Sequence, residues 1–171
     1  MLLGQMMERR RSLATLFMGV AGLLGGALLV LLVGNVAARA FDLNPVWVSE
    51  TSRVLFVWGT AAGMISVSLS GQHFRVDLAS KGAIEAEAGP GYWELVIQIV
   101  VCLVLGYIAW FAYPTIERAA VQPMASIPLT YGFLRAALVV ALAGMLLAHL
   151  WRSLEIVLAL ATSGATSRRE G

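Results

Sequence analysis

Long apolar stretches alternate with short polar connections along this chain, and the pattern occurs four times. The first stretch carries no charged residue from Leu13 to Val33. An α-helix needs about 20 apolar residues to cross the roughly 30 Å of hydrocarbon in a bilayer. Each stretch is long enough for that, and the predicted spans are residues 13–38, 46–70, 92–114 and 129–152.

The apolar stretches are uninterrupted, which favours helices over strands. A membrane β-barrel alternates apolar and polar residues with a period of two, and an open strand in lipid leaves backbone groups unpaired. The sequence therefore predicts an all-α integral membrane protein with four transmembrane helices in a single domain, 1–171. We expect residues 71–91 to be a cytoplasmic loop that begins with a short interfacial segment after the second helix, and the small polar residues 163–171 predict a flexible tail.

Composition supports the bilayer as the solvent, because 59% of the residues are hydrophobic and only 13% are charged. Soluble domains carry roughly 25% charged residues. The net charge of +2 gives no reason to expect binding to nucleic acid. A single cysteine, Cys102, excludes a disulfide framework, and His73 and His149 alone offer little for metal or haem chemistry. We expect no cofactor in this chain.

The N-terminus superficially resembles a secretory signal. Three arginines, Arg9 to Arg11, precede the first apolar stretch, and Ala38-Arg39-Ala40 looks like a signal-peptidase site. The apolar core of a signal peptide is about 7–15 residues long, which is shorter than this stretch. We therefore expect a retained first span.

Basic residues predict that both termini are cytoplasmic. Cytoplasmic loops of membrane proteins carry an excess of lysine and arginine. Eight basic residues lie on one side of the predicted spans and four on the other, and the two short outer loops are then about 40–46 and 117–127. The inner set is Arg9, Arg10, Arg11, Arg75, Lys81, Arg152, Arg168 and Arg169, and the outer set is Arg39, Arg53, Arg118 and Arg135.

Glu50 and Arg53 are charged residues near the start of the second span. They are three residues apart, so they occupy neighbouring positions on one face of a helix. A charge at the bilayer centre costs about 2.5–3.5 kcal/mol. Either the two form a structural ion pair with Arg53 reaching outward, or they belong to a proton or ion relay. No further ionisable residue continues deeper into the span, which favours the structural interpretation.

Four glycines are candidates for helix packing. Gly22 and Gly26 in the first span and Gly59 and Gly63 in the second have the spacing that lets two helix backbones approach. The alternative is that glycine is simply common in membrane helices.

Two charged residues of the second outer loop, Glu117 and Arg118, are suited to contact a periplasmic protein, although simple solvation explains them as well.

Several features of an independent enzyme or transporter are missing from the sequence. It has no glycine-rich phosphate loop after a strand, no Gly-x-Ser-x-Gly motif and no histidine pair at metal-binding spacing. Secondary transporters often use helices broken by Gly or Pro at the midplane. Here the prolines are expected near span ends or in loops, with Pro128 at the start of the fourth helix. They are Pro45, Pro90, Pro114, Pro123 and Pro128.

Two linked motifs resemble a known family. They are Trp47-x-x-Glu50-x-x-Arg53-x-Leu55-x-x-Trp58-Gly59 and Gly71-x-His73-x-Arg75-Val76-Asp77. A looser match runs from Pro123 through Tyr131-Gly132. Their order and spacing resemble the DctQ-type small permease subunits of tripartite ATP-independent periplasmic (TRAP) transporters.

The resemblance implies a scaffold in the bacterial inner membrane. A large membrane subunit would hold the substrate and sodium sites and move in an elevator-like manner, and a periplasmic binding protein would deliver a carboxylate and bind only transiently. The resemblance implies assembly and placement in the lipid, with no substrate contact, for the motif residues Trp47, Glu50, Arg53, Trp58, His73, Arg75 and Asp77.

Two other classes stay open at this point. A four-helix membrane enzyme would act on a small glutathione-like anion through Arg53 and Arg135. A small multidrug exporter also has four helices, but such exporters resemble shorter chains with a glutamate in the first span, where this chain has no acid. A membrane chaperone or sensor is a further alternative.

Overall fold

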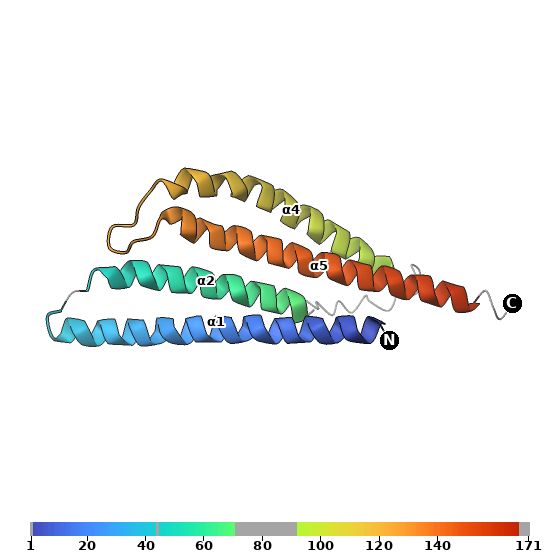
Figure 1. Cartoon of the computed structure of the whole chain (residues 1–171), viewed down its shortest axis with the longest axis horizontal. Coiled ribbons are helices and arrows are strands. Elements are labelled where there is room, and N and C mark those ends of the chain that lie inside the picture. Colours follow the sequence, from blue (N-terminus) through green and yellow to red (C-terminus); the bar gives the residue numbers. More distant parts are fainter. Residues whose placement is uncertain (1, 44, 71–91, 168–171) are drawn as a thin grey trace.

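The computed structural model of the chain describes residues 2–43, 45–70 and 92–167, and this part is built from four helices (Figure 1). They are α1 (Leu2–Ala40), α2 (Trp47–Ser70), α4 (Tyr92–Ala120) and α5 (Tyr131–Ser167). Each contains a segment long and apolar enough to cross a membrane. The prediction of an all-helical chain with four such helices is confirmed. The predicted segment 71–91, with His73, Arg75 and Asp77, lies outside the described residues.

The helices extend beyond the predicted spans. α1 begins at Leu2, and α5 continues to Ser167, so residues 163–167 are helical where a flexible tail was predicted. Pro114 lies inside α4 and does not end it, and α5 begins three residues after Pro128. Hydropathy marks only the part of a helix that lies in hydrocarbon, whereas backbone hydrogen bonding continues into the polar ends.

The four helices form one flat layer in the order α1, α2, α5, α4 (Figure 1). Extensive contacts join α1 to α2, α2 to α5 and α5 to α4. The chain is therefore two helical hairpins placed side by side, with α2 and α5 in the centre. We call the end with the α1–α2 and α4–α5 connections the hairpin end, and the opposite end, where α1 begins, the terminal end.

Small residues form most of the contacts between the helices. Ala119 and Ala137 are completely buried, whereas no large side chain in the described part of the chain is fully buried. Many large apolar side chains are exposed instead, as with Leu29 of α1 and Trp110 of α4. This pattern suits a membrane protein, in which close backbone approach and van der Waals packing hold the helices together.

Two of the four predicted packing glycines lie against another helix. A Cβ at Gly59 would lie 3.4 Å from Cβ of Leu24, and one at Gly63 would lie 3.9 Å from Cβ of Ala21. Within the described residues, a Cβ at Gly22 or Gly26 would meet nothing within 4 Å. The second span therefore contributes its two predicted glycines to the α1–α2 contact, whereas the two predicted glycines of α1 take no part in it.

Two glycines outside the predicted set allow much closer contacts. A Cβ at Gly132 would lie only 2.8 Å from Cα of Ala120, and one at Gly144 only 2.6 Å from Cγ1 of Ile65. Gly132 thus permits the approach of α5 to α4, and Gly144 the approach of α5 to α2.

Candidate functional site

Glu50 clamps the α4–α5 connection to α2. Its Oε1 accepts a hydrogen bond of 2.9 Å from the backbone N–H of Ala125. Its Oε2 accepts one of 2.8 Å from the backbone N–H of Ser126 and one of 2.5 Å from the Ser126 hydroxyl. Hydrogen bonds to an ionised carboxylate are roughly twice as strong as neutral ones. We call this arrangement the Glu50 clamp, and it holds the two helical hairpins together at the hairpin end.

The connection has a defined backbone that presents these two N–H groups. The N–H of Met124 donates to the carbonyl of Leu129 at 2.8 Å, and the N–H of Tyr131 donates to the carbonyl of Gln122 at 3.0 Å. These bonds fold residues 122–131 into a compact loop whose outer backbone groups point at Glu50. The looser sequence match, which runs from Pro123 through Tyr131-Gly132, therefore falls on the loop that binds Glu50.

Arg53 is not paired with Glu50. No ion pair among the described residues joins them, and both oxygens of Glu50 accept hydrogen bonds from Ala125 and Ser126 instead. The Arg53 side chain is exposed on the surface of α2. Glu50 therefore binds Ser126, 76 positions away, in place of the expected structural pair with Arg53.

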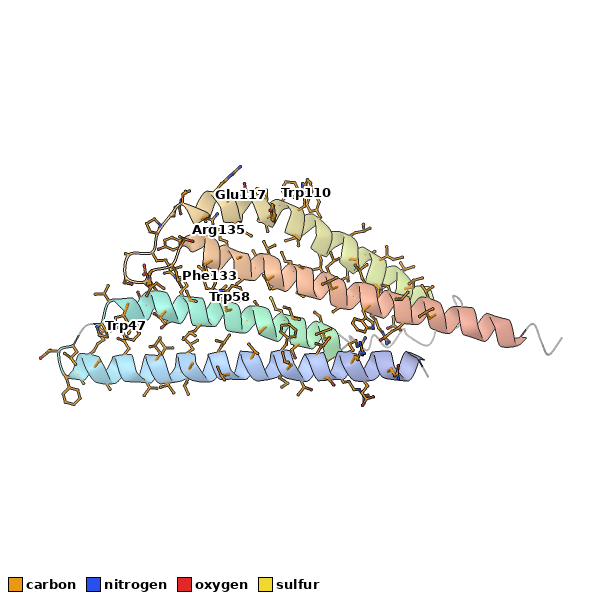
Figure 2. All side chains as sticks on the ribbon, in the orientation of Figure 1. Trp47, Trp58, Trp110, Glu117, Phe133 and Arg135 are labelled. Carbon is orange, nitrogen blue, oxygen red and sulfur yellow. The ribbon has the colours of Figure 1, made fainter. Side chains whose placement is uncertain are left out.

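The two tryptophans of the sequence motif occupy different environments (Figure 2). Trp58 packs on Phe133 of α5 with ring centroids 4.9 Å apart and planes inclined by 31°. It also packs against the buried Ala61, Ala137 and Ala141, so it belongs to the α2–α5 contact. Trp47 is half-exposed at the start of α2. Trp58 therefore has a structural role within this chain.

Arg135 binds within the α4–α5 hairpin. One of its terminal nitrogens donates to the carbonyl oxygen of Thr115 at 3.2 Å. Thr115 belongs to α4, which lies on the far side of α5 from α2 and Arg53 (Figure 1). The two arginines therefore do not form the convergent anion pocket that a glutathione-like substrate would require.

A second polar cluster joins three helices at the terminal end. Arg10 of α1 lies 3.2 Å from Glu155 of α5, and the two side chains are only 12% and 7% exposed. Arg152 bridges Glu155 at 3.4 Å and Glu94 of α4 at 2.8 Å. From the sequence, Arg10 and Arg152 indicated only the orientation of the chain. The signal for their pairing lay in Glu94 and Glu155, which stand at the same ends of the last two apolar stretches.

Further polar side chains inside the spans also bond between helices. Nδ1 of His149 lies 2.6 Å from Oε1 of Gln98, which links α5 to α4. The Ser66 hydroxyl donates to the carbonyl of Ala14 at 2.7 Å, which links α2 to α1. His149 is thus a packing residue that takes part in a helix–helix hydrogen bond.

Glu117 lies exposed near the hairpin end of α4 (Figure 2). The next residue, Arg118, is exposed in the last turn of the same helix. Their contact with a periplasmic protein stays a prediction. No group of three or more His, Cys, Asp or Glu side chains in the described ranges is placed to hold a metal ion.

A comparison with protein families decides the identity of this arrangement. The model for the DctQ component of tripartite ATP-independent periplasmic transporters matches residues 28–159, which include α2, α4, the Glu50 clamp and most of α5. The chain belongs to the DctQ family. A comparison with curated proteins gave no match.

Membership confirms the resemblance that the sequence motifs suggested. This DctQ chain is the small membrane subunit of a TRAP transporter, and a tripartite system supplies its other components as partners. The family is not enzymatic, so the alternative of a four-helix membrane enzyme is wrong. The polar residues described above are therefore to be understood as parts of a subunit that works with others.

Proposed function

We propose that this DctQ chain is a non-catalytic scaffold that pairs with a large elevator-type membrane subunit. The complex would take up a carboxylate-type substrate, driven by sodium and supplied by a periplasmic binding protein. The substrate and sodium sites would belong to the large subunit. The observation that carries the proposal is the flat layer of helices, in which the polar side chains described above bind other groups of the same chain.

A transport path needs polar groups around a cavity that crosses the membrane. In the described part of this chain, α1 and α4 lie at opposite edges of the layer, so the helices do not close around such a cavity. Glu50, Glu94 and Glu155 all bind groups of the chain itself. Those contacts stabilise the layer and leave none of these three carboxylates poised to bind a sodium ion.

The proposed orientation places the terminal end in the cytoplasm and the hairpin end in the periplasm of the bacterial inner membrane. Arg9, Arg10 and Arg11 at the start of α1 support this direction. Glu117 and Arg118 would then face the periplasm, where a binding protein docks. His73, Arg75 and Asp77 would face the cytoplasm and serve assembly and contact with lipid headgroups.

Reconstitution into vesicles tests the proposal. Vesicles containing this chain together with its large subunit, given the binding protein and an inward sodium gradient, are expected to accumulate labelled carboxylate substrate. Vesicles containing this chain alone are expected to accumulate none. Accumulation by this chain alone would overturn the scaffold role, and a failure of the two membrane subunits to co-purify would overturn the pairing.

A further inference from the structure

An apolar groove runs between the two central helices on one face of the layer. Phe56, Thr60 and Met64 line it from α2, and Ala137, Leu138 and Ala141 line it from α5. The alanines form its floor, and Phe56, Met64 and Leu138 are each more than 40% exposed at its rim. Such a combination of small floor residues and large apolar rims lets another membrane helix approach closely.

Arg53 lies about one helical turn before Phe56, on the hairpin-end side of the groove. It precedes Thr60 by seven residues and Met64 by eleven, so the three share one face of α2. It lies within a segment of membrane-spanning hydropathy, six residues after the start of the helix. No hydrogen bond or ion pair joins Arg53 to another described residue, in contrast to Glu50, Arg135 and Arg152.

We propose that a membrane helix of the large subunit packs in this groove and places a carboxylate opposite Arg53. Charge complementarity carries the choice of partner, because a guanidinium within a membrane span is stabilised by an anion. The partner helix that bears this carboxylate must also present an apolar face to fill the groove. The inference rests on the proposed pairing with the large subunit and adds the surface on which it occurs.

Two matched pairs of variants test the docking surface by co-purification with an affinity-tagged large subunit. Leu138 lines the groove, whereas Val140 lies about 200° around the same helix and is nearly as exposed. Arg53→Glu reverses the charge at the groove, and Arg118→Glu reverses an exposed charge of α4 at the same end.

Leu138→Trp and Arg53→Glu are expected to lower recovery of this chain with the large subunit by about fivefold or more. Val140→Trp and Arg118→Glu are expected to leave it unchanged. Equal recovery of all four variants would overturn the docking surface while the pairing stands. Failure of the wild-type chain to be recovered would instead overturn the proposed function.

A crosslinking measurement on the otherwise unaltered chain decides the matter if a variant fails to fold. Thr60 replaced by benzoylphenylalanine is expected to form a light-dependent adduct with the large subunit in native membrane, and the same replacement at Val140 is not. An adduct of position 60 with phospholipid alone would show that lipid fills the groove and would overturn the proposal.

Discussion

At the scale of single residues, the charged side chains hold distant parts of the chain together. The importance of Glu50 could be predicted from a sequence motif, but its partner could not. A neighbouring arginine is the obvious choice for a helical glutamate, yet two backbone N–H groups with fixed geometry compete better because they lose no side-chain entropy. Pairings such as that of Arg10 with Glu155 involve residues 145 positions apart, which local spacing cannot reveal.

Removing the Glu50 carboxylate is expected to destabilise the protein. Glu50→Ala leaves the N–H groups of Ala125 and Ser126 without their acceptor, so the unfolding temperature of the variant is expected to fall below that of the wild-type chain. Thermal unfolding in detergent, followed by circular dichroism, measures this loss. Glu117→Ala removes an exposed carboxylate at the same end and is the control. Equal unfolding temperatures for the two variants would contradict the clamp.

Glu155→Ala is expected to lower the stability of the protein more than Glu50→Ala does, because it leaves the nearly buried Arg10 without its anion. Breaking a buried ion pair from one side costs about 3–5 kcal/mol. Arg152 is more exposed and retains Glu94, so it adds little to this loss. Urea or thermal unfolding provides the measurement, with Glu8→Ala of the same exposed terminal end as control. A loss no greater than that of the control would show that the Arg10–Glu155 pair is not needed.

At the scale of helices, hydropathy predicts the existence of all four but not their ends or contacts. The first two spans both contain the small-xxx-small spacing, yet α2 uses its Gly59 and Gly63 while Gly22 and Gly26 of α1 face away from the other described helices. Membrane helices are apolar all round, so the sequence gives no periodic signal for which face packs. The two closest contacts, at Gly144 and Gly132, involve glycines outside the predicted pairs.

Gly132→Ala is expected to separate α4 from α5. The new methyl group would meet backbone atoms of Ala120 at 2.8 Å and 2.9 Å, which cannot move aside as a flexible side chain can. Overpacking of this kind costs about 1–3 kcal/mol. Gly106→Ala is the matched control, since its added Cβ meets nothing within 4 Å of the described atoms and alanine favours helices over glycine. Thermal unfolding should therefore shift downward for the first variant and stay level or rise for the second.

At the scale of the whole molecule, the flat layer explains why this chain works as a subunit. Soluble proteins bury their apolar side chains inside, whereas this layer presents them on both broad faces. The order α1, α2, α5, α4 could not be predicted from the sequence, because four uniformly apolar helices are compatible with several arrangements. Contacts such as Gly144 with Ile65 and Trp58 with Phe133 select this one.

The Glu50 clamp joins residues that are synthesised at different times. Its carboxylate leaves the ribosome 76 residues before Ser126, and translation at 5–20 residues per second separates the two by about 4–15 s. During that interval the first helical hairpin has to enter the bilayer with a carboxylate that lacks its final partners. Arg53, three residues away on the same helix, is then the cation nearest to Glu50 in the sequence. It can neutralise the Glu50 carboxylate until the second hairpin is inserted and supplies Ala125 and Ser126.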